Sequence, residues 1–114
     1  MEFNINGALD RLDNDKDILK MMISDFLETD KNIPGEFNAL LEKKDLDSIR
    51  SLAHRMKGCL LSLGAETLGE KFKDLERGIK EGRYSLSDAE SKLPGIISGF
   101  NEAYTYYEQL LNTL

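Results

Sequence analysis

The apolar residues of this chain recur at the spacing of an α-helix along almost its whole length. Valine does not occur, and no stretch alternates apolar and polar residues for long, so strand signals are almost absent. At 114 residues the chain has room for one core, and we expect a single domain spanning residues 1–114. The pattern therefore predicts an all-α fold.

The first half of the chain predicts one long helix preceded by a short one. The long helix spans Lys16–Lys43, with Asp15 as its N-cap. Because the apolar stripe keeps its phase past Pro34, we expect one helix kinked by the proline rather than two unrelated helices. A short helix over Ile5–Leu12 places its apolar residues on one side.

Three further helices follow, each with a recognisable start or end. Asp45 caps the second helix, and Gly64 ends it in a position that favours a left-handed residue. The third helix ends near Gly82, and the fourth opens with the capping-box pattern Ser87–Glu90 and contains Pro94. Short connections between long amphipathic helices predict an antiparallel four-helix bundle (up-down-up-down) with a short extra N-terminal helix.

Composition excludes several classes of function. Fifteen basic residues against 21 acidic ones give a net charge of −6, and no basic cluster larger than a pair occurs, which argues against nucleic-acid binding. The longest uncharged stretch, Leu93–Asn101, is too short to span a membrane. One cysteine cannot form an internal disulfide, and the N-terminus has no apolar segment typical of a signal peptide. We expect a cytoplasmic protein that binds neither nucleic acid nor membrane.

The only histidine, His54, lies in the helix that Asp45 caps. At about 100° per residue it falls roughly 140° from Ile49, the centre of the apolar stripe, and so points towards solvent. Gly58, one turn on, costs about 1 kcal/mol in a helix interior but lets a second macromolecule approach the ring. Lys57 on the adjoining face disfavours imidazolium and stabilises a bound anion. This arrangement fits a nucleophile for a phosphoryl group; the alternative is a surface histidine beside an unimportant lysine.

Other chemistries lack the necessary residues. One outward-facing histidine cannot supply a zinc or di-iron site in a bundle. Cys59 lies about 140° around the helix from His54, which excludes a Cys–His nucleophile pair, and we expect it at the core edge. No glycine-rich phosphate loop occurs. Five acidic residues are interpreted as helix caps and solvated faces: Glu42, Asp45, Asp47, Asp74 and Glu76.

The residues around His54 form a motif with fixed spacing. The segment Leu52–Gly58 reads LAHRMKG and is followed by Leu63–Ala65 and then Leu75–Glu76. This pattern resembles the histidine-containing phosphotransfer (HPt) domain of phosphorelays, and the resemblance extends over nearly the whole chain. The sequence departs from the family at Cys59, where Ser, Ala or Thr is preferred, and at Met56, where Leu is preferred; neither position touches the chemistry.

The resemblance implies a role for each residue of the motif. His54 would accept a phosphoryl group from a receiver-domain aspartate and pass it to another receiver. Lys57 would steady the phosphoryl oxygens, Gly58 would leave room for the partner's active site, and Gly64 would shape the hairpin. Such a phosphotransfer intermediate has no kinase activity, ATP site or cofactor of its own, since Mg²⁺ would be bound by the receiver. The implied partners are response-regulator receiver domains, with a hybrid sensor histidine kinase as a further candidate, and we expect a monomer.

The sequence leaves two alternative functions open and predicts a surface for binding a partner. The chain could be a helical adaptor that binds a receiver without accepting phosphate, or the dimerisation bundle of a histidine kinase. The intact histidine and lysine argue against the adaptor, and the arginine that follows the histidine argues against the kinase bundle. The expected partner-binding residues are Arg50, Ser51, Leu61, Leu9 and Leu12; for Leu61, packing against a neighbouring helix is an equal alternative.

Overall fold

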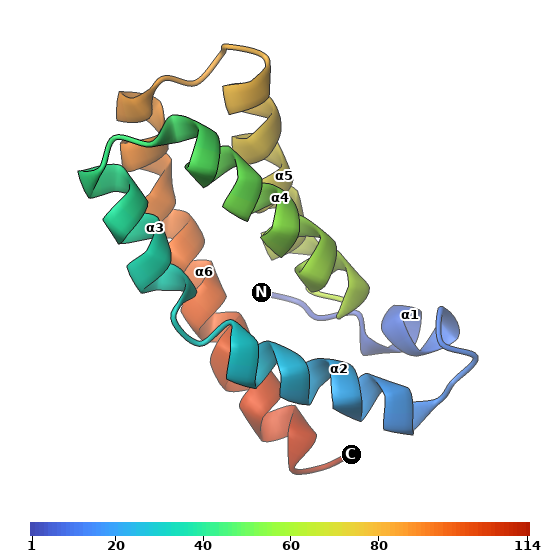
Figure 1. Cartoon of the computed structure of the whole chain (residues 1–114). Helices are drawn as coiled ribbons and strands as arrows, with labels where there is room; N and C mark the ends of the chain where they lie inside the picture. The colour runs from blue at the N-terminus through green and yellow to red at the C-terminus, as the bar shows by residue number, and fades with distance from the viewer.

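A computed structural model describes residues 1–114 and contains helices and no strands. Figure 1 shows the six helices, and their order confirms the predicted all-helical bundle. The helices are α1 (Ile5–Asp10), α2 (Lys16–Thr29), α3 (Ile33–Glu42), α4 (Leu46–Ser62), α5 (Glu66–Lys80) and α6 (Leu86–Leu111).

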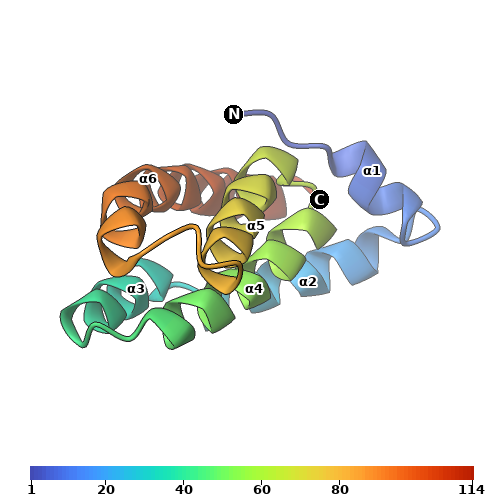
Figure 2. The same ribbon diagram turned by 90° about the horizontal axis from the view of Figure 1, so that it is seen from above.

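The bundle is built around a tight hairpin and one long helix. The chain runs along α3, returns along α4, and reverses again into α5 and α6 (Figure 1). Seen from above, α4 lies beside α5, and α2 follows α3 on the same side of the molecule (Figure 2). The long helix α6 contacts α2, α3 and α5, and its apolar residues therefore lie at the centre of the packing. None of the six helices is both long and apolar enough to cross a membrane.

Aromatic side chains fill the core at both ends of the bundle. Phe37 and Phe72 stack with ring centroids 5.8 Å apart, joining α3 to α5. Towards the other end, Phe26 of α2 meets Phe100 of α6 edge to face at 5.7 Å. Tyr107 is fully buried there and donates its hydroxyl to the Leu63 carbonyl at 2.6 Å. Most residues of the apolar stripes predicted from the helical period lie in this core, but Ile18, where the first stripe begins, is 42 % exposed.

The predicted single helix over Lys16–Lys43 is wrong, because the chain breaks between Thr29 and Ile33. Pro34 lies in the first turn of α3, where a missing backbone N–H leaves no hydrogen bond unmade. The break also buries the Asp30 side chain, which pairs with Arg55 of α4 at 2.7 Å. The apolar residues of α2 and α3 continue one helical pattern across the break, because both helices pack their apolar faces against α6.

Three of the predicted helix ends are correct and one is shifted. The side chains of Asp15 and Asp45 accept hydrogen bonds from the first turns of α2 and α4, as expected of N-caps. Helix α6, which is the fourth of the predicted long helices, begins two residues earlier than predicted. Its capping box is formed by Ser85 and Asp88 rather than by Ser87–Glu90. Gly64 ends the second long helix with a φ of +88°.

The N-terminal segment closes the turn between α4 and α5. The Asn4 N–H donates to the Gly64 carbonyl at 2.8 Å. The Arg11 guanidinium donates to the carbonyls of Leu61 and Ser62, at 2.7 and 3.3 Å, which satisfies two acceptors at the end of α4. The hairpin turn is therefore held both by its own glycine and by the chain that passes over it.

We predict that Gly64→Ala destabilises the fold more than Gly82→Ala. Both glycines have positive φ, where an L-residue costs about 1–2 kcal/mol. A Cβ at Gly82 would meet nothing within 4 Å, whereas a Cβ at Gly64 would lie 2.4 Å from the Asn4 carbonyl oxygen. Urea unfolding should show an additional loss of about 1–3 kcal/mol for Gly64→Ala. Equal losses would mean that the Asn4 segment moves aside freely.

Candidate functional site

His54 lies in the middle of α4 with its ring in solvent, as the helical wheel predicts. Its side chain is 63 % exposed, while its neighbour Ala53 is fully buried on the core side of the helix. An α-helix fixes this division, because successive residues turn by about 100°. The ring is therefore held on a rigid element and is open to another protein.

A carboxylate that the sequence interpretation placed on a solvated face anchors the ring. Glu76 of α5 is buried, with only 9 % of its side chain exposed, and its Oε1 lies 2.6 Å from Nδ1 of His54. Its second oxygen, Oε2, accepts from Nζ of Lys57 at 3.1 Å. The interpretation of Glu76 as a cap or solvated residue is thus wrong: its two oxygens hold two side chains of the neighbouring helix.

The sequence contains a signal for this contact in the symmetry of the hairpin. His54 and Glu76 each lie eleven residues from Ala65, and Leu61 and Gly69 each lie four residues from it. Residues equally distant from a tight antiparallel turn face each other, and positions seven apart share a helix face. The Leu61 side chain contacts Gly69, which shows the same pairing of α4 with α5 about two helical turns nearer the loop that joins them.

The hydrogen bond to Glu76 selects one tautomer of the His54 ring. An ionised carboxylate can only accept hydrogen bonds, so Nδ1 carries the hydrogen and Nε2 keeps its lone pair. The Lys57 Nζ lies 3.5 Å from Nδ1 and cannot donate to a nitrogen that is already protonated. In the neutral ring, Nε2 is therefore the nitrogen with the free lone pair.

The charge of Glu76 is maintained by its two partners. Burial is the largest single influence and by itself would raise the pKa of Glu76. The hydrogen bonds from His54 and Lys57, together with the positive charge of Lys57, outweigh burial and lower this pKa below its ordinary value of 4.5. The Glu76 carboxylate lies closer to Nδ1 than the Lys57 ammonium does, so the ring faces a negative charge that the sequence argument did not include.

Gly58 leaves the surface beside His54 open. A Cβ at this position would have no atom within 4 Å. No packing contact within the chain therefore requires a glycine at this position. Gly69 is different, because a Cβ there would lie 2.6 Å from the Leu61 side chain. Gly69 therefore allows the close approach of α4 and α5.

The remaining predicted partner-binding residues are distributed over two parts of the molecule. Arg50 is half-buried and Ser51 is exposed, and both lie on α4 within one turn of His54. Leu61 is half-buried and covers Gly69 of α5. Leu9 and Leu12 are half-buried, and both pack against the core near the N-terminus. The structure therefore keeps Arg50 and Ser51 beside His54, and it partly covers the three leucines.

Arg55, which follows His54, points to a different side of α4, about 100° around the helix. Its guanidinium binds the buried Asp30 at the α2–α3 break, and Sγ of Cys59 lies 3.8 Å from the same carboxylate. Burial and the charge of Asp30 raise the pKa of the Cys59 thiol to about 12. Cys59 packs at the core edge as predicted, and its thiol is a poor nucleophile.

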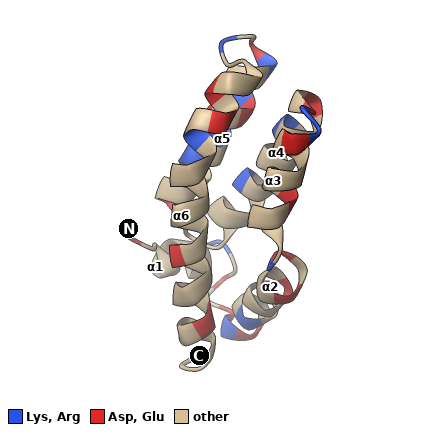
Figure 3. Cartoon of the chain, turned by 90° about the vertical axis from the view of Figure 1, so that its left-hand side faces the viewer, with Lys and Arg blue, Asp and Glu red and all other residues tan.

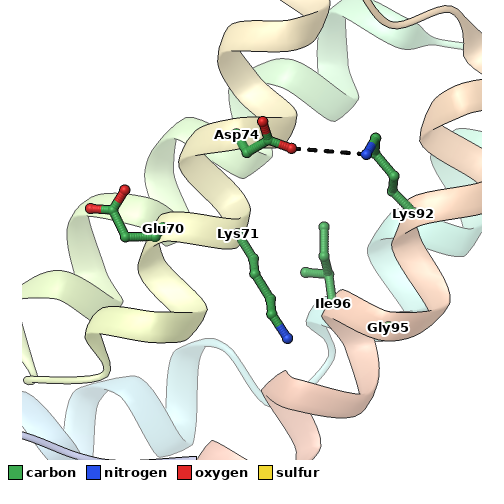
Figure 4. A pocket seen from close by; sticks show the side chains of 6 residues that line it. All are labelled: Glu70, Lys71, Asp74, Lys92, Gly95 and Ile96. Atoms are coloured by element: carbon green, nitrogen blue, oxygen red, sulfur yellow. Dashed lines mark ion pairs between the residues drawn. The ribbon is translucent and has the colours of Figure 1, made fainter.

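A separate groove of about 430 Å³ lies between α5 and α6 (Figure 4). It carries charges of both signs, and Asp74 faces Lys92 across it at 4.0 Å. None of its lining residues belongs to the His54 site. Acidic and basic residues are likewise interspersed over the visible helices in Figure 3. No group of three or more His, Cys, Asp or Glu side chains in the structure could hold a metal ion.

Comparison with protein families assigns the chain to a family. The family model described as the Hpt domain matches residues 21–112, which is most of the chain. This chain belongs to the Hpt family. No curated protein and no solved structure matches it significantly. Hpt domains are phosphotransfer modules of phosphorelays and typically interact with receiver domains. The match begins within α2, so α1 lies outside it.

We predict that the Glu76 carboxyl of this Hpt domain titrates below pH 4.5 and that Lys57→Met raises its midpoint. The variant removes a hydrogen bond and a positive charge that favour the carboxylate. Carbon-detected NMR of the side-chain carboxyl measures the midpoint. Lys80→Met is the matched control, because Lys80 is an exposed lysine of α5 that makes no ion pair with Glu76.

The same shift has a consequence for stability. Because folding lowers this pKa, Glu76 stabilises the folded chain above pH 4.5, and this contribution is lost as the pH falls through the lowered value. A wild-type midpoint at or above 4.5 would contradict the described network.

Proposed function

We propose that Nε2 of His54 accepts a phosphoryl group from the aspartyl phosphate of one receiver domain and transfers it to the aspartate of another. The observation that carries this proposal is the pairing of Nδ1 with Glu76 on an exposed ring, because it leaves Nε2 as a free nucleophile in solvent. The open surface at Gly58 supports the approach of a folded partner.

The transfer balances without a proton leaving the ring. The lone pair of Nε2 forms the nitrogen–phosphorus bond while the bond between phosphorus and the aspartyl oxygen breaks, and the electron pair leaves with the receiver's carboxylate. The ring then carries a hydrogen on Nδ1 and phosphorus on Nε2, and is positively charged. Glu76, 2.6 Å from Nδ1, stabilises that charge as it forms.

Lys57 contributes through charge rather than through covalent chemistry. Its ammonium pairs with Glu76 in the free chain, and its flexible side chain is 21 % exposed. We propose that it turns towards the phosphoryl oxygens during transfer, where a positive charge lowers the barrier. The Mg²⁺ used in this chemistry belongs to the receiver, and the domain acts as a monomer on receivers that include that of a hybrid sensor kinase.

We predict that His54→Gln abolishes phosphoryl acceptance while leaving the fold intact. The side chain is mostly exposed and the glutamine amide keeps an N–H donor for Glu76, so we expect stability to change by less than about 0.5 kcal/mol. The assay mixes the chain with ³²P-labelled receiver domains and tests for label that is acid-labile and alkali-stable. Circular dichroism and thermal melting of the variant serve as the control for folding.

Lys57→Ala supplies a graded comparison in the same assay. It should slow transfer about tenfold without eliminating it, which corresponds to about 1.4 kcal/mol of transition-state stabilisation. Label retained by His54→Gln would contradict the proposal. A wild-type chain that binds receivers but never accepts label would instead support the helical adaptor.

A further inference from the structure

Four successive carbonyl groups at the C-terminal end of α4 accept hydrogen bonds from other parts of the chain. They belong to Leu61, Ser62, Leu63 and Gly64. The Arg11 guanidinium binds the first two, at 2.7 and 3.3 Å. The Tyr107 hydroxyl binds the third at 2.6 Å, and the Asn4 N–H binds the fourth at 2.8 Å. Carbonyls at the end of a helix lack partners within it, so these contacts hold this end of α4 in place.

Most of these contacts come from a part of the chain that the family model does not match. The model begins at residue 21, so neither Asn4 nor Arg11 belongs to the matched region. Asn4 also reaches the first residue of α5, because its Nδ2 donates to Oε1 of Glu66 at 3.1 Å. The N-terminal segment therefore bridges the last turn of α4 and the first turn of α5. Figure 1 shows α1 beside this end of the hairpin.

The end of α4 and the reacting ring belong to one stiff element. His54 lies seven residues before Leu61, which is about two helical turns. Leu61 lies over Gly69 and His54 contacts Glu76, so both pairs depend on one alignment of α4 against α5. A displacement at the end of α4 therefore changes the position of the ring relative to Glu76.

The contact between His54 and Glu76 tolerates little displacement. Nδ1 and Oε1 are 2.6 Å apart, and a side-chain hydrogen bond is lost at about 3.6 Å, so a shift of about 1 Å is enough to break it. The nearby contact of Leu61 with Gly69 does not prevent such a shift. Glycine lets two helices come close, but it has no side chain that could interlock with the leucine.

On the basis of the proposed function, we infer that Arg11 is a positioning residue for the phosphotransfer site. By holding the last carbonyls of α4, it keeps Nδ1 of His54 within hydrogen-bond reach of Glu76. Its guanidinium suits this role, because the N–H groups lie in a fixed plane and can bind two adjacent acceptors at once. Arg11 forms no hydrogen bond with either residue of the site, so it acts through the position of α4.

The first measurement is the tautomer of His54 in long-range ¹H–¹⁵N correlation spectra. Arg11→Met removes the donor, and we expect the fraction of rings protonated at Nδ1 to fall. Arg11→Lys keeps a charged donor and should restore most of that fraction. Arg83→Met is the matched control and should leave the tautomer unchanged, because Arg83 is an exposed arginine that donates only to Glu81. An unchanged tautomer in Arg11→Met would overturn the inference.

The second measurement is the rate at which phosphoramidate, a small donor that needs no docking, phosphorylates the chain. It is made below the melting temperature of every variant. Arg11→Met and Glu76→Ala should each slow acceptance at least about threefold, and Arg83→Met should change it by less than about 1.5-fold. Because Arg11 acts through the contact of Glu76 with His54, Arg11→Met should add no further slowing to Glu76→Ala. Independent effects would multiply in the double variant and would contradict the inference.

The two measurements separate this inference from the proposed function. An unaltered chain that accepts phosphate from neither phosphoramidate nor phosphorylated receivers would overturn the proposed function, and the tautomer would still decide whether Arg11 positions the ring. If Arg11→Met lowered the melting temperature but kept both the tautomer and the rate of the unaltered chain, Arg11 would only stabilise the fold. That result would overturn the positioning role alone.

Discussion

The hydrogen bond between Glu76 and His54 joins the two helices of the hairpin at the residue that we propose as the phosphoryl acceptor. It orients the ring and selects the nitrogen that bears the hydrogen, and in the proposed transfer its negative charge lies where the phosphorylated ring becomes positive. Lys57 binds the second oxygen of the same carboxylate and helps keep it ionised despite its burial. The proposed site therefore consists of few residues, which the hairpin brings into register.

That register depends on residues far from the reacting nitrogen. Gly64 reverses the chain with a positive φ, and Gly69 lets the Leu61 side chain lie against the backbone of α5. The N-terminal segment then covers the turn through Asn4 and Arg11. Small residues and backbone hydrogen bonds thus determine which face of α5 meets α4, and Glu76 lies on that face.

The helices, most of their caps and the outward direction of His54 could be predicted, because each depends on the period and termini of a single helix. The break between α2 and α3 could not, since it involves an ion pair between Asp30 and Arg55, which are 25 residues apart. Glu76 was misassigned for the same reason: on its own helix it resembles any polar residue at the border of the stripe. The family resemblance included Glu76 in its pattern without assigning it a role, and the structure supplies its contacts with His54 and Lys57.

The tautomer of His54 is the most direct test of this account. Long-range ¹H–¹⁵N correlation spectra of the imidazole at pH 8 distinguish a protonated ring nitrogen from one with a free lone pair, and the chain has only one histidine to observe. The account predicts that Nδ1 is protonated and Nε2 is free in the unaltered chain, and that this preference weakens in Glu76→Gln. A dominant Nε2-protonated ring in the unaltered chain would contradict it.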